Sequence, residues 1–438
     1  MPWRSKIGDS ATRRLSEREA PEAVWVRKAL AQVSALAAGG AAGAALRSLG
    51  VVLFAREVPL PVYGAVVLAQ AVVFACVYVG KTGFGMWGQR EVGSGQRDSA
   101  VGAAVVGQCL AVSVAVFLSA LLVLWDVGGR MRLTPSEGLL VLIGGLANGI
   151  SVEWVHVAKG RAKGVGLMKT VRGGVFAAVA VMGLLRPNGL TLALAIAASE
   201  CLYACLTLGL IFRNAGSYGL MPSLSSVVRA MGGASRFALV NCVGIVWNAD
   251  IVLLGYWWGP SAVAVYNVAG RIVDAVGGVQ RAILAILSQN LFRAARHGTR
   301  AIQLEWQKSA KWSLAAGAVG IMVAVVVSMV GGPFLPSAYH GVGVLVAILA
   351  IKQMLALQAG LNASAFGALG SERRIVKSAI SAACMCIVGA PVLVLKASAV
   401  GAALAMVITE AVSAGVLLWD LRCMWGSATP LLAGVDEA

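Results

Sequence analysis

Four basic side chains lie inside long apolar stretches of the chain, where a charge is costly to bury. They are Arg47, Arg271, Arg281 and Lys352. A guanidinium group matches phosphate oxygens through paired hydrogen bonds, and the lysine ammonium acts as a point charge. We therefore predict that Arg47, Arg271 and Lys352 contact an anionic, phosphorylated group. Arg281 lies nearer a predicted helix end, where it would help that group to enter.

Four carboxylates occur in the same apolar stretches: Glu200, Asp250, Asp274 and Glu410. Acidic side chains inside a membrane often relay protons or bind a coupling ion. A structural role is the alternative, in which each acid only neutralises a nearby cation. The pairs would then be Arg47 with Glu200, Arg271 with Asp250 or Asp274, and Lys352 with Glu410. The sequence leaves both interpretations open.

Metal and catalytic chemistry have little support in the sequence. Glu153 and His156 are three residues apart and share one helical face. Helix bundles bind metal with two such Glu-x-x-His pairs, and this chain contains only one. The eight cysteines fall mostly inside apolar runs and are typical of small apolar fillers. We expect no metal, no cofactor and no catalytic residue.

The composition is that of an integral membrane protein. Of the 438 residues, 59% are hydrophobic and 13% are charged, and the mean hydropathy is +0.82. Soluble domains carry about 25% charged residues. A net charge of +17 would suggest nucleic-acid binding in a soluble protein. Here the basic residues lie mostly between apolar runs, so we expect membrane lipids as partners and no nucleic acid.

Twelve apolar runs are long enough to span a bilayer as helices. Their approximate ranges are 29–54, 60–80, 100–125, 138–158, 170–185, 189–212, 236–257, 261–291, 312–335, 341–367, 375–395 and 398–421. The connecting segments are too short to hold a soluble catalytic domain. The sequence therefore predicts an all-α polytopic membrane protein with twelve transmembrane helices.

Basic residues alternate between the two predicted sides of the membrane. Of the 36 lysines and arginines, 27 lie on the side of the termini, 5 lie on the opposite side, and the remainder lie within spans. Positive loops stay in the cytoplasm, so we predict that both termini are cytoplasmic. This is a multi-pass arrangement.

A weak internal repeat divides the chain in two. At an offset of 203 residues, Arg47 aligns with Asp250 and Tyr63 with Tyr266. We predict two six-helix bundles related by a pseudo-two-fold axis along the membrane normal, an arrangement known in transporters, with the binding site between the halves. The predicted parts are a cytoplasmic N-terminal segment 1–28, an N-terminal bundle 29–212, a cytoplasmic linker 213–235, a C-terminal bundle 236–421 and a cytoplasmic tail 422–438.

Two segments carry a family resemblance. They are LFAREVPLPVYGAVVLAQAVVFACVYVGKTGFGMWGQRE in the first half and NADIVLLGYWWGPSAVAVYNVAGRI in the second. Both resemble polysaccharide exporters of the MOP flippase superfamily, and most closely the Wzx-like flippases of lipid-linked oligosaccharides. The local pattern places Asp250 before a turn that contains Gly255 and Gly259, with Tyr266 after it. Ala264 departs from the pattern, because many relatives have glycine before their tyrosine.

The resemblance implies a non-enzymatic flippase in the bacterial inner membrane. Its substrate would be an undecaprenyl-pyrophosphate-linked oligosaccharide, such as an O-antigen or exopolysaccharide repeat unit, moved by alternating access through a cationic central cavity. A polysaccharide polymerase would be a possible partner. Two alternatives stay open: a MATE-like multidrug cation antiporter and a polytopic polysaccharide ligase or polymerase.

Overall fold

The computed structural model of the chain describes residues 34–93, 99–127, 133–159, 161–213, 222–246 and 249–428. Within these ranges the structure is helical and contains no β-strand. The first helix is Ser34–Glu57. It is followed by α2 (Leu60–Gly93), α3 (Ser99–Val127), α4 (Pro135–Ile150), α5 (Glu153–Ala158), α6 (Ala162–Gly183), α7 (Gly189–Phe212), α9 (Leu224–Val246), α10 (Ala249–Ala294), α11 (Thr299–Gly331), α12 (Val342–Ala368) and α13 (Glu372–Ala428). Short 3₁₀ turns flank α11.

Ten helices in the described ranges are long and apolar enough to cross a membrane. This confirms a polytopic, all-helical membrane protein; the predicted count of twelve and the two-bundle symmetry stay predictions. Two helices far exceed the about 20 residues that a crossing needs. These are α10, with 46 residues, and α13, with 57. Each contains non-helical backbone, at Gly259 in α10 and at Ala397 and Ser398 in α13.

Local sequence explains where several helices begin or bend. Thr134 caps α4 by accepting a hydrogen bond from the backbone N–H of Glu137, whose side chain accepts one from the N–H of Thr134 in return. In α10, Gly259 has φ 79° and Pro260 follows it. The left-handed φ favours glycine, and proline at the next position starts a new helical turn with its φ already set. The chain therefore reverses direction there.

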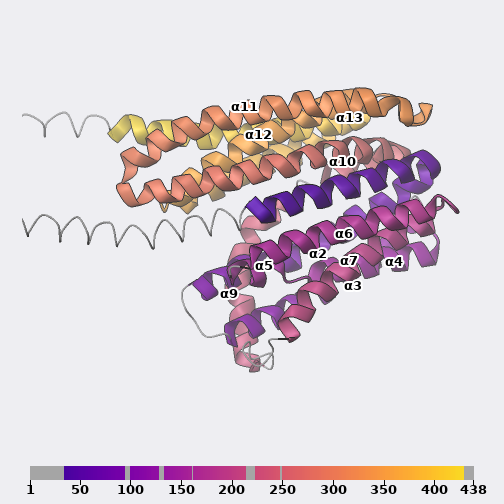
Figure 1. The fold of residues 1–438 in the computed structure, drawn as a ribbon, viewed down its shortest axis with the longest axis horizontal. Helices are drawn as coiled ribbons and strands as arrows, with labels where there is room; N and C mark the ends of the chain where they lie inside the picture. The colour runs from indigo at the N-terminus through magenta and orange to yellow at the C-terminus, as the bar shows by residue number, and fades with distance from the viewer. Residues whose placement is uncertain are drawn as a thin grey trace, which may run out of the picture.

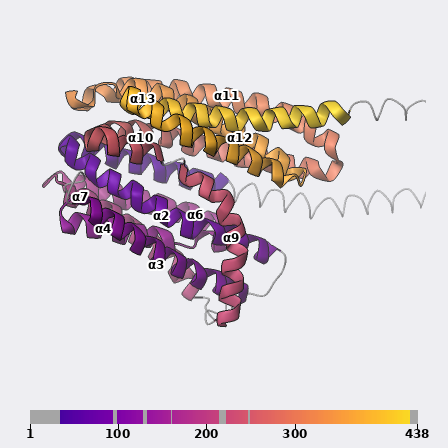
Figure 2. The same ribbon diagram turned by 180° about the vertical axis from the view of Figure 1, so that it is seen from behind.

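Two groups of helices diverge from one end of the molecule. Figures 1 and 2 show α10, α11, α12 and α13 on one side and α2, α3, α4, α6 and α7 on the other. The turn end is the end where the first helix gives way to α2 and where Gly259 bends α10. The opposite end, where α7 stops and α9 starts, is the linker end. The two groups are close at the turn end and apart at the linker end.

Close packing of α2 against α10 joins the groups at the turn end. A Cβ added to Gly64 would overlap the backbone carbonyl of Pro260, so the two helices cross in near contact. Tyr63 donates a hydrogen bond of 2.8 Å from its hydroxyl to the Asn267 side-chain oxygen. This contact links residues that are 204 positions apart.

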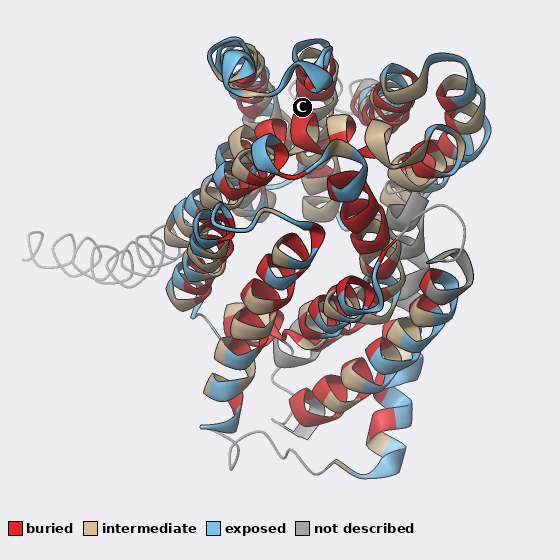
Figure 3. Ribbon diagram, turned by 90° about the vertical axis from the view of Figure 1, so that its right-hand side faces the viewer, coloured by how far each residue is buried: buried red, intermediate tan, exposed pale blue. Residues whose placement is uncertain are grey.

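The exterior of the helices is strongly apolar. Phe117, Met182, Leu185 and Met329 are each more than 60% exposed, which would be unfavourable in water. Figure 3 shows the buried residues on helix faces that turn toward neighbouring helices. Such an exterior is suited to contact with lipid tails.

Two helix boundaries differ from the ranges expected from hydropathy. α6 begins at Ala162, eight residues before the predicted run at 170. α9 begins at Leu224, within the predicted linker 213–235, and continues to Val246 while lying against α2 and α3. Polar and basic residues at these helix starts mask the helix in a hydropathy profile. The division of the chain into bundles, linker and terminal segments stays a prediction, and segments 1–28 and 429–438 lie outside the described residues.

Candidate functional site

A cavity of about 500 Å³ lies between the first helix, α6 and α10. Its polar lining consists of Arg47, Ser48, Lys169, Arg172, Arg271, Asp274 and Arg281. Gly40, Gly43, Gly173 and Gly278 leave room in the wall because they have no side chains. The structure thus brings together three of the four predicted cations, Arg47, Arg271 and Arg281, from both halves of the chain.

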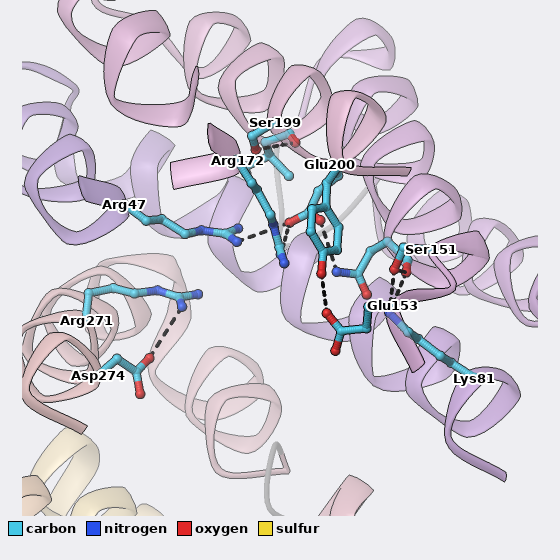
Figure 4. Close-up of polar contacts among 12 residues, drawn as sticks. Arg47, Lys81, Ser151, Glu153, Arg172, Ser199, Glu200, Arg271 and Asp274 are labelled. Carbon is cyan, nitrogen blue, oxygen red and sulfur yellow. Dashed lines mark hydrogen bonds and ion pairs between the residues drawn. The ribbon is translucent and has the colours of Figure 1, made fainter. Parts of the chain in front are cut away.

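One wall of the cavity is organised around Glu200 of α7. This carboxylate is fully buried and forms ion pairs with Arg47, at 3.1 Å, and with Arg172. The Asn148 side-chain amide donates a third hydrogen bond to it, at 3.1 Å. Figure 4 shows both arginines directed at Glu200. A buried carboxylate needs such partners to offset its desolvation, so Glu200 positions both guanidinium groups at the wall.

An aromatic ring packs against each of the same two guanidinium groups. The Arg47 guanidinium carbon lies 5.2 Å from the centre of the Phe176 ring, and that of Arg172 lies 5.1 Å from the centre of the Tyr203 ring. Cation–π contacts at these distances are attractive. The hydroxyl of Tyr203 in turn donates to the Glu153 carboxylate, which also pairs with Lys169 at 3.3 Å.

The opposite wall comes from α10. Arg271 Nη1 lies 3.4 Å from Asp274 Oδ2, one helical turn away. Arg281 Nη2 lies 3.4 Å from the backbone carbonyl oxygen of Asp274, and no ion pair of Arg281 occurs among the described residues. Figure 4 shows Arg47 and Arg271 on facing helices, and their charges repel each other. Ser48 joins the walls by donating to the backbone carbonyl of Arg271 at 2.7 Å.

Charge is unbalanced in this cavity. Five cations line it: Arg47, Lys169, Arg172, Arg271 and Arg281. Three carboxylates form ion pairs with them, namely Glu153, Glu200 and Asp274. Two positive charges remain in excess among the described residues. Positive charges held at the wall of a partly enclosed space favour an anionic ligand.

Lys352 does not line this cavity, although the sequence predicts that it contacts the same ligand as the arginines. It lies on α12, close enough to Asp250 and Glu410 to interact electrostatically with both. Asp250 is buried and accepts a hydrogen bond from the Tyr266 hydroxyl. Arg271 pairs with Asp274 and not with Asp250. We call Lys352, Asp250 and Glu410 the C-half cluster; none of the three lines the cavity, and no ion pair within 4 Å joins Lys352 to Asp250 or to Glu410 in the described part of the chain.

Sequence reasoning missed Lys169 and Arg172 as cavity residues. Hydropathy assigns both to a cytoplasmic loop and its edge, because the apolar run begins only at residue 170. In the structure α6 starts at Ala162, so that they lie two to three turns inside a helix. A helical wheel drawn over 162–183 places Lys169 and Arg172, which are three positions apart, on the same face of the helix.

A second polar network closes a break between α4 and α5. The helix stops at Ile150, and Gln108 of α3 donates from its amide nitrogen to the carbonyl oxygens of Gly149, at 2.7 Å, and Ser151, at 3.1 Å. The Lys81 ammonium donates to the carbonyl oxygen of Asn148 at 2.8 Å. Broken helices are tolerated in membranes only where the freed backbone groups find partners.

Comparison with known proteins gives similarity at the level of structure only. No family model matches the sequence. No curated protein matches it either.

Solved structures of similar fold include an inward-facing MATE-family multidrug resistance transporter of the MOP superfamily, with TM-score 0.65, 13% identity, and coverage of 88% of this chain and 96% of that one. The eukaryotic MATE transporter AtDTX14 gives TM-score 0.64 and 14% identity, with coverage of 90% and 96%. The lipid II flippase MurJ, in an inward closed conformation, gives TM-score 0.69 and 10% identity, with coverage of 87% and 86%. The chain therefore has the fold shared by MATE transporters and MurJ.

Proposed function

We propose that this protein is an alternating-access transporter that moves a lipid-linked oligosaccharide across the inner membrane, from the cytoplasmic to the outer leaflet. The substrate head group would be the pyrophosphate of an undecaprenyl-linked glycan. The excess of positive charge in the cavity between the first helix, α6 and α10 carries this proposal. Similarity of fold to MurJ is consistent with it.

The cavity offers the pyrophosphate guanidinium donors on two facing walls. Arg47 and Arg172 would approach it from the first half, and Arg271 from the second. Each guanidinium has five N–H donors, and the contacts with Glu200 and Asp274 use only part of that capacity. Arg281, which is exposed, lies nearer the linker end and would make first contact. Pyrophosphate binding would then tie the two halves together.

The shape of the molecule indicates the side from which the substrate would enter. The cavity extends toward the linker end, whereas the contact between α2 and α10 closes the turn end. We infer twelve spans, obtained by dividing α10 at Gly259 and α13 at Ala397 and Ser398. The ten residues of α10 before Gly259 extend only about 15 Å, so we assign them to the same span as the end of α9, as the predicted run 236–257 does. With the linker end in the cytoplasm, as the basic residues predict, the structure would be the loading state.

For the energy source we propose the C-half cluster. Glu200 is engaged by two arginines and an amide, which would hold it ionised throughout a cycle. Asp250 and Glu410 are instead buried near a single ammonium group, that of Lys352. One ammonium balances only one carboxylate, so the other could take up a proton or a sodium ion.

A MATE-like antiporter of organic cations is the second candidate, because the fold is equally similar to MATE transporters. The charge of the cavity disfavours it, since organic cations would be repelled. A ligase or polymerase is disfavoured as well, because the solved structures of similar fold are transporters.

A binding experiment separates the two candidates. Purified full-length protein in detergent is titrated with farnesyl pyrophosphate as a short isoprenoid probe, and with tetraphenylphosphonium as an organic cation. We expect saturable binding of the pyrophosphate that weakens with added salt, and no saturable binding of the cation. The reverse pattern would exclude the flippase proposal and favour the antiporter.

A further inference from the structure

A second concave surface lies on the outside of the second half, between α10 and α11. It is a groove of about 500 Å³. Its lining is Ile283, Leu287, Asn290, Glu305, Lys308, Ser309, Trp312, Ala315, Ala316 and Val319. None of these residues lines the cationic cavity. The groove is therefore a separate site.

Polarity changes along this groove in one direction. Asn290, Glu305 and Lys308 lie toward the linker end, and Leu287, Ala315 and Val319 lie farther along the helices toward the turn end. Within α11, no charged residue follows Lys311. From Trp312 to Phe334 the chain has 23 uncharged residues, which at about 1.5 Å each extend roughly 34 Å. This length matches a hydrocarbon core of about 30 Å.

The change in polarity thus coincides with the membrane boundary. Glu305 and Lys308 would then lie at the level of the lipid head groups, and Ala315 and Val319 lie about 5 and 11 Å deeper by helical rise from Trp312. Trp312, which is 64% exposed, lies at the transition, where tryptophan is enriched. An amphipathic molecule that lies along α11 would match both ends of the groove.

The polar end carries one charge of each sign. Glu305 and Lys308 are three residues apart on one helical face and both line the groove. Asn290 adds an amide from α10. The Ser309 hydroxyl also lines the groove, is buried, and has no hydrogen-bond partner within the described part of the chain. A buried hydroxyl without a partner costs free energy, so a ligand oxygen at this point would be stabilising.

We propose that this groove binds a phospholipid whose head group carries both a phosphate and a primary ammonium, that is, a phosphatidylethanolamine. The phosphate pairs with Lys308, the ammonium donates hydrogen bonds to Glu305 and the Asn290 side-chain oxygen, and a glycerol ester oxygen accepts from Ser309. One acyl chain lies over Leu287, Ala316 and Val319. Phosphatidylcholine has no N–H donor for Glu305, and phosphatidylglycerol has no cation, so both complement the polar end less well.

The test uses quenching of tryptophan fluorescence by brominated acyl chains. Full-length protein is reconstituted in vesicles of phosphatidylcholine mixed with increasing fractions of a brominated lipid. The signal of Trp312 is the difference between the wild-type protein and Trp312→Phe. We expect brominated phosphatidylethanolamine to quench Trp312 at mole fractions about tenfold lower than brominated phosphatidylcholine, as hydrogen bonds to charged groups imply.

Matched variants decide whether the groove is responsible. Lys308→Gln and Glu305→Gln should each abolish the preference for phosphatidylethanolamine. Ala316→Phe should also abolish it, because the phenyl ring would fill the apolar part of the groove. Lys311→Gln removes an exposed cation from the same helix, outside the groove, and should retain the preference. Lys308→Gln and Glu305→Gln change residues at the membrane surface, where a substitution has little effect on folding. They therefore remain informative if Ala316→Phe does not fold.

Several results would overturn the proposal. Equal quenching by phosphatidylethanolamine and phosphatidylcholine would mean that the groove only contacts bulk lipid. Stronger quenching by phosphatidylglycerol would make it an anion site. Loss of the preference in Lys311→Gln would remove the groove as its origin. None of these outcomes depends on the transported substrate, because the measurement follows Trp312 and not transport.

Discussion

Glu200 determines how the guanidinium groups are presented at the cavity wall. A carboxylate buried in a membrane protein is costly unless it is paired, and breaking such a pair costs about 3 to 5 kcal/mol. Its pairs with Arg47 and Arg172 therefore have a structural role, which was the alternative interpretation for Arg47. A structural pair and a ligand-binding role are compatible, since each guanidinium has donors left over. Glu200 sets the position of both guanidinium groups, and both arginines line the cavity.

Arg271 allows the ligand role to be tested with little effect on folding. Its carboxylate partner, Asp274, is half exposed, so the loss of that pair has a small energetic cost. We expect Arg271→Gln to weaken binding of farnesyl pyrophosphate by about tenfold or more, the value of one hydrogen bond to a charged group. Isothermal titration in detergent measures this affinity.

Arg293→Gln is the matched control for Arg271, because Arg293 lies on the same helix outside the cavity lining. Its affinity for the probe should equal that of the wild-type protein. Equal affinity of Arg271→Gln and the wild type would show that the α10 wall does not bind the pyrophosphate.

At the scale of helices, the contact between α2 and α10 holds the two groups together at the turn end. Gly64 permits the close approach of Pro260, and the hydrogen bond from Tyr63 to Asn267 joins the two helices beside it. Tyr63 and Tyr266, which the internal repeat aligns, form different hydrogen bonds. Tyr63 bonds across the halves, whereas Tyr266 bonds to Asp250 within its own half. Only the first of these contacts opposes separation of α2 from α10.

Tyr63→Phe should therefore shift the molecule toward opening at the turn end. A lost hydrogen bond of about 1 kcal/mol changes such a population about fivefold. Distances between spin labels placed on α2 and α11 at that end measure the shift. Ser288→Ala, the control, removes a hydrogen bond to Ser364 that joins α10 to α12 within the second half, and it should leave the distance distribution unchanged. A similar shift in both variants would exclude a specific role for the Tyr63 contact.

The break between α4 and α5 depends on Gln108 for its backbone partners. Gln108→Leu would leave the carbonyl oxygens of Gly149 and Ser151 without their donor, and the Trp154 indole N–H without its acceptor. At about 1 to 3 kcal/mol for each buried polar group left unpaired, we expect a clear fall in the melting temperature in detergent. Ser113→Ala, on the same helix, removes only a bond to the backbone of Cys109 and should have little effect. A stable Gln108→Leu protein would contradict the assigned role.

Considered as a whole, the molecule has one closed end and one end toward which the helix groups diverge. The residues nearest the linker end of the cavity are reached first from that side, and Arg281 is exposed there. The asymmetry of basic residues predicts that this side faces the cytoplasm. An accessibility experiment tests the cavity and the orientation together.

In a background from which the eight native cysteines have been replaced by alanine, Arg281→Cys should react with a membrane-impermeant maleimide in inside-out vesicles and not in intact cells. Farnesyl pyrophosphate should slow that reaction. The control is a cysteine in place of Asn188, at the turn end, which should show the opposite sidedness. Labelling of Arg281→Cys from outside intact cells would reverse the proposed orientation.

The sequence by itself determined that the chain forms membrane helices, and it identified several of the charged residues that belong to them. Spanning length and apolar character decide membrane insertion helix by helix, without knowledge of any partner. For the same reason the order of residues is enough to single out Arg47, Glu200, Arg271 and Asp274 as charges that are costly to bury.

Only the tertiary structure decided which of those charges share a cavity. Gly39 and Gly43 let the first helix pack directly on the backbone of α6, and this contact brings Arg172 beside Arg47. Lys352 lies in the C-half cluster and not at the cavity. The rotation of a helix about its axis depends on which small residues its neighbours present, and that information is distributed over segments more than a hundred residues apart.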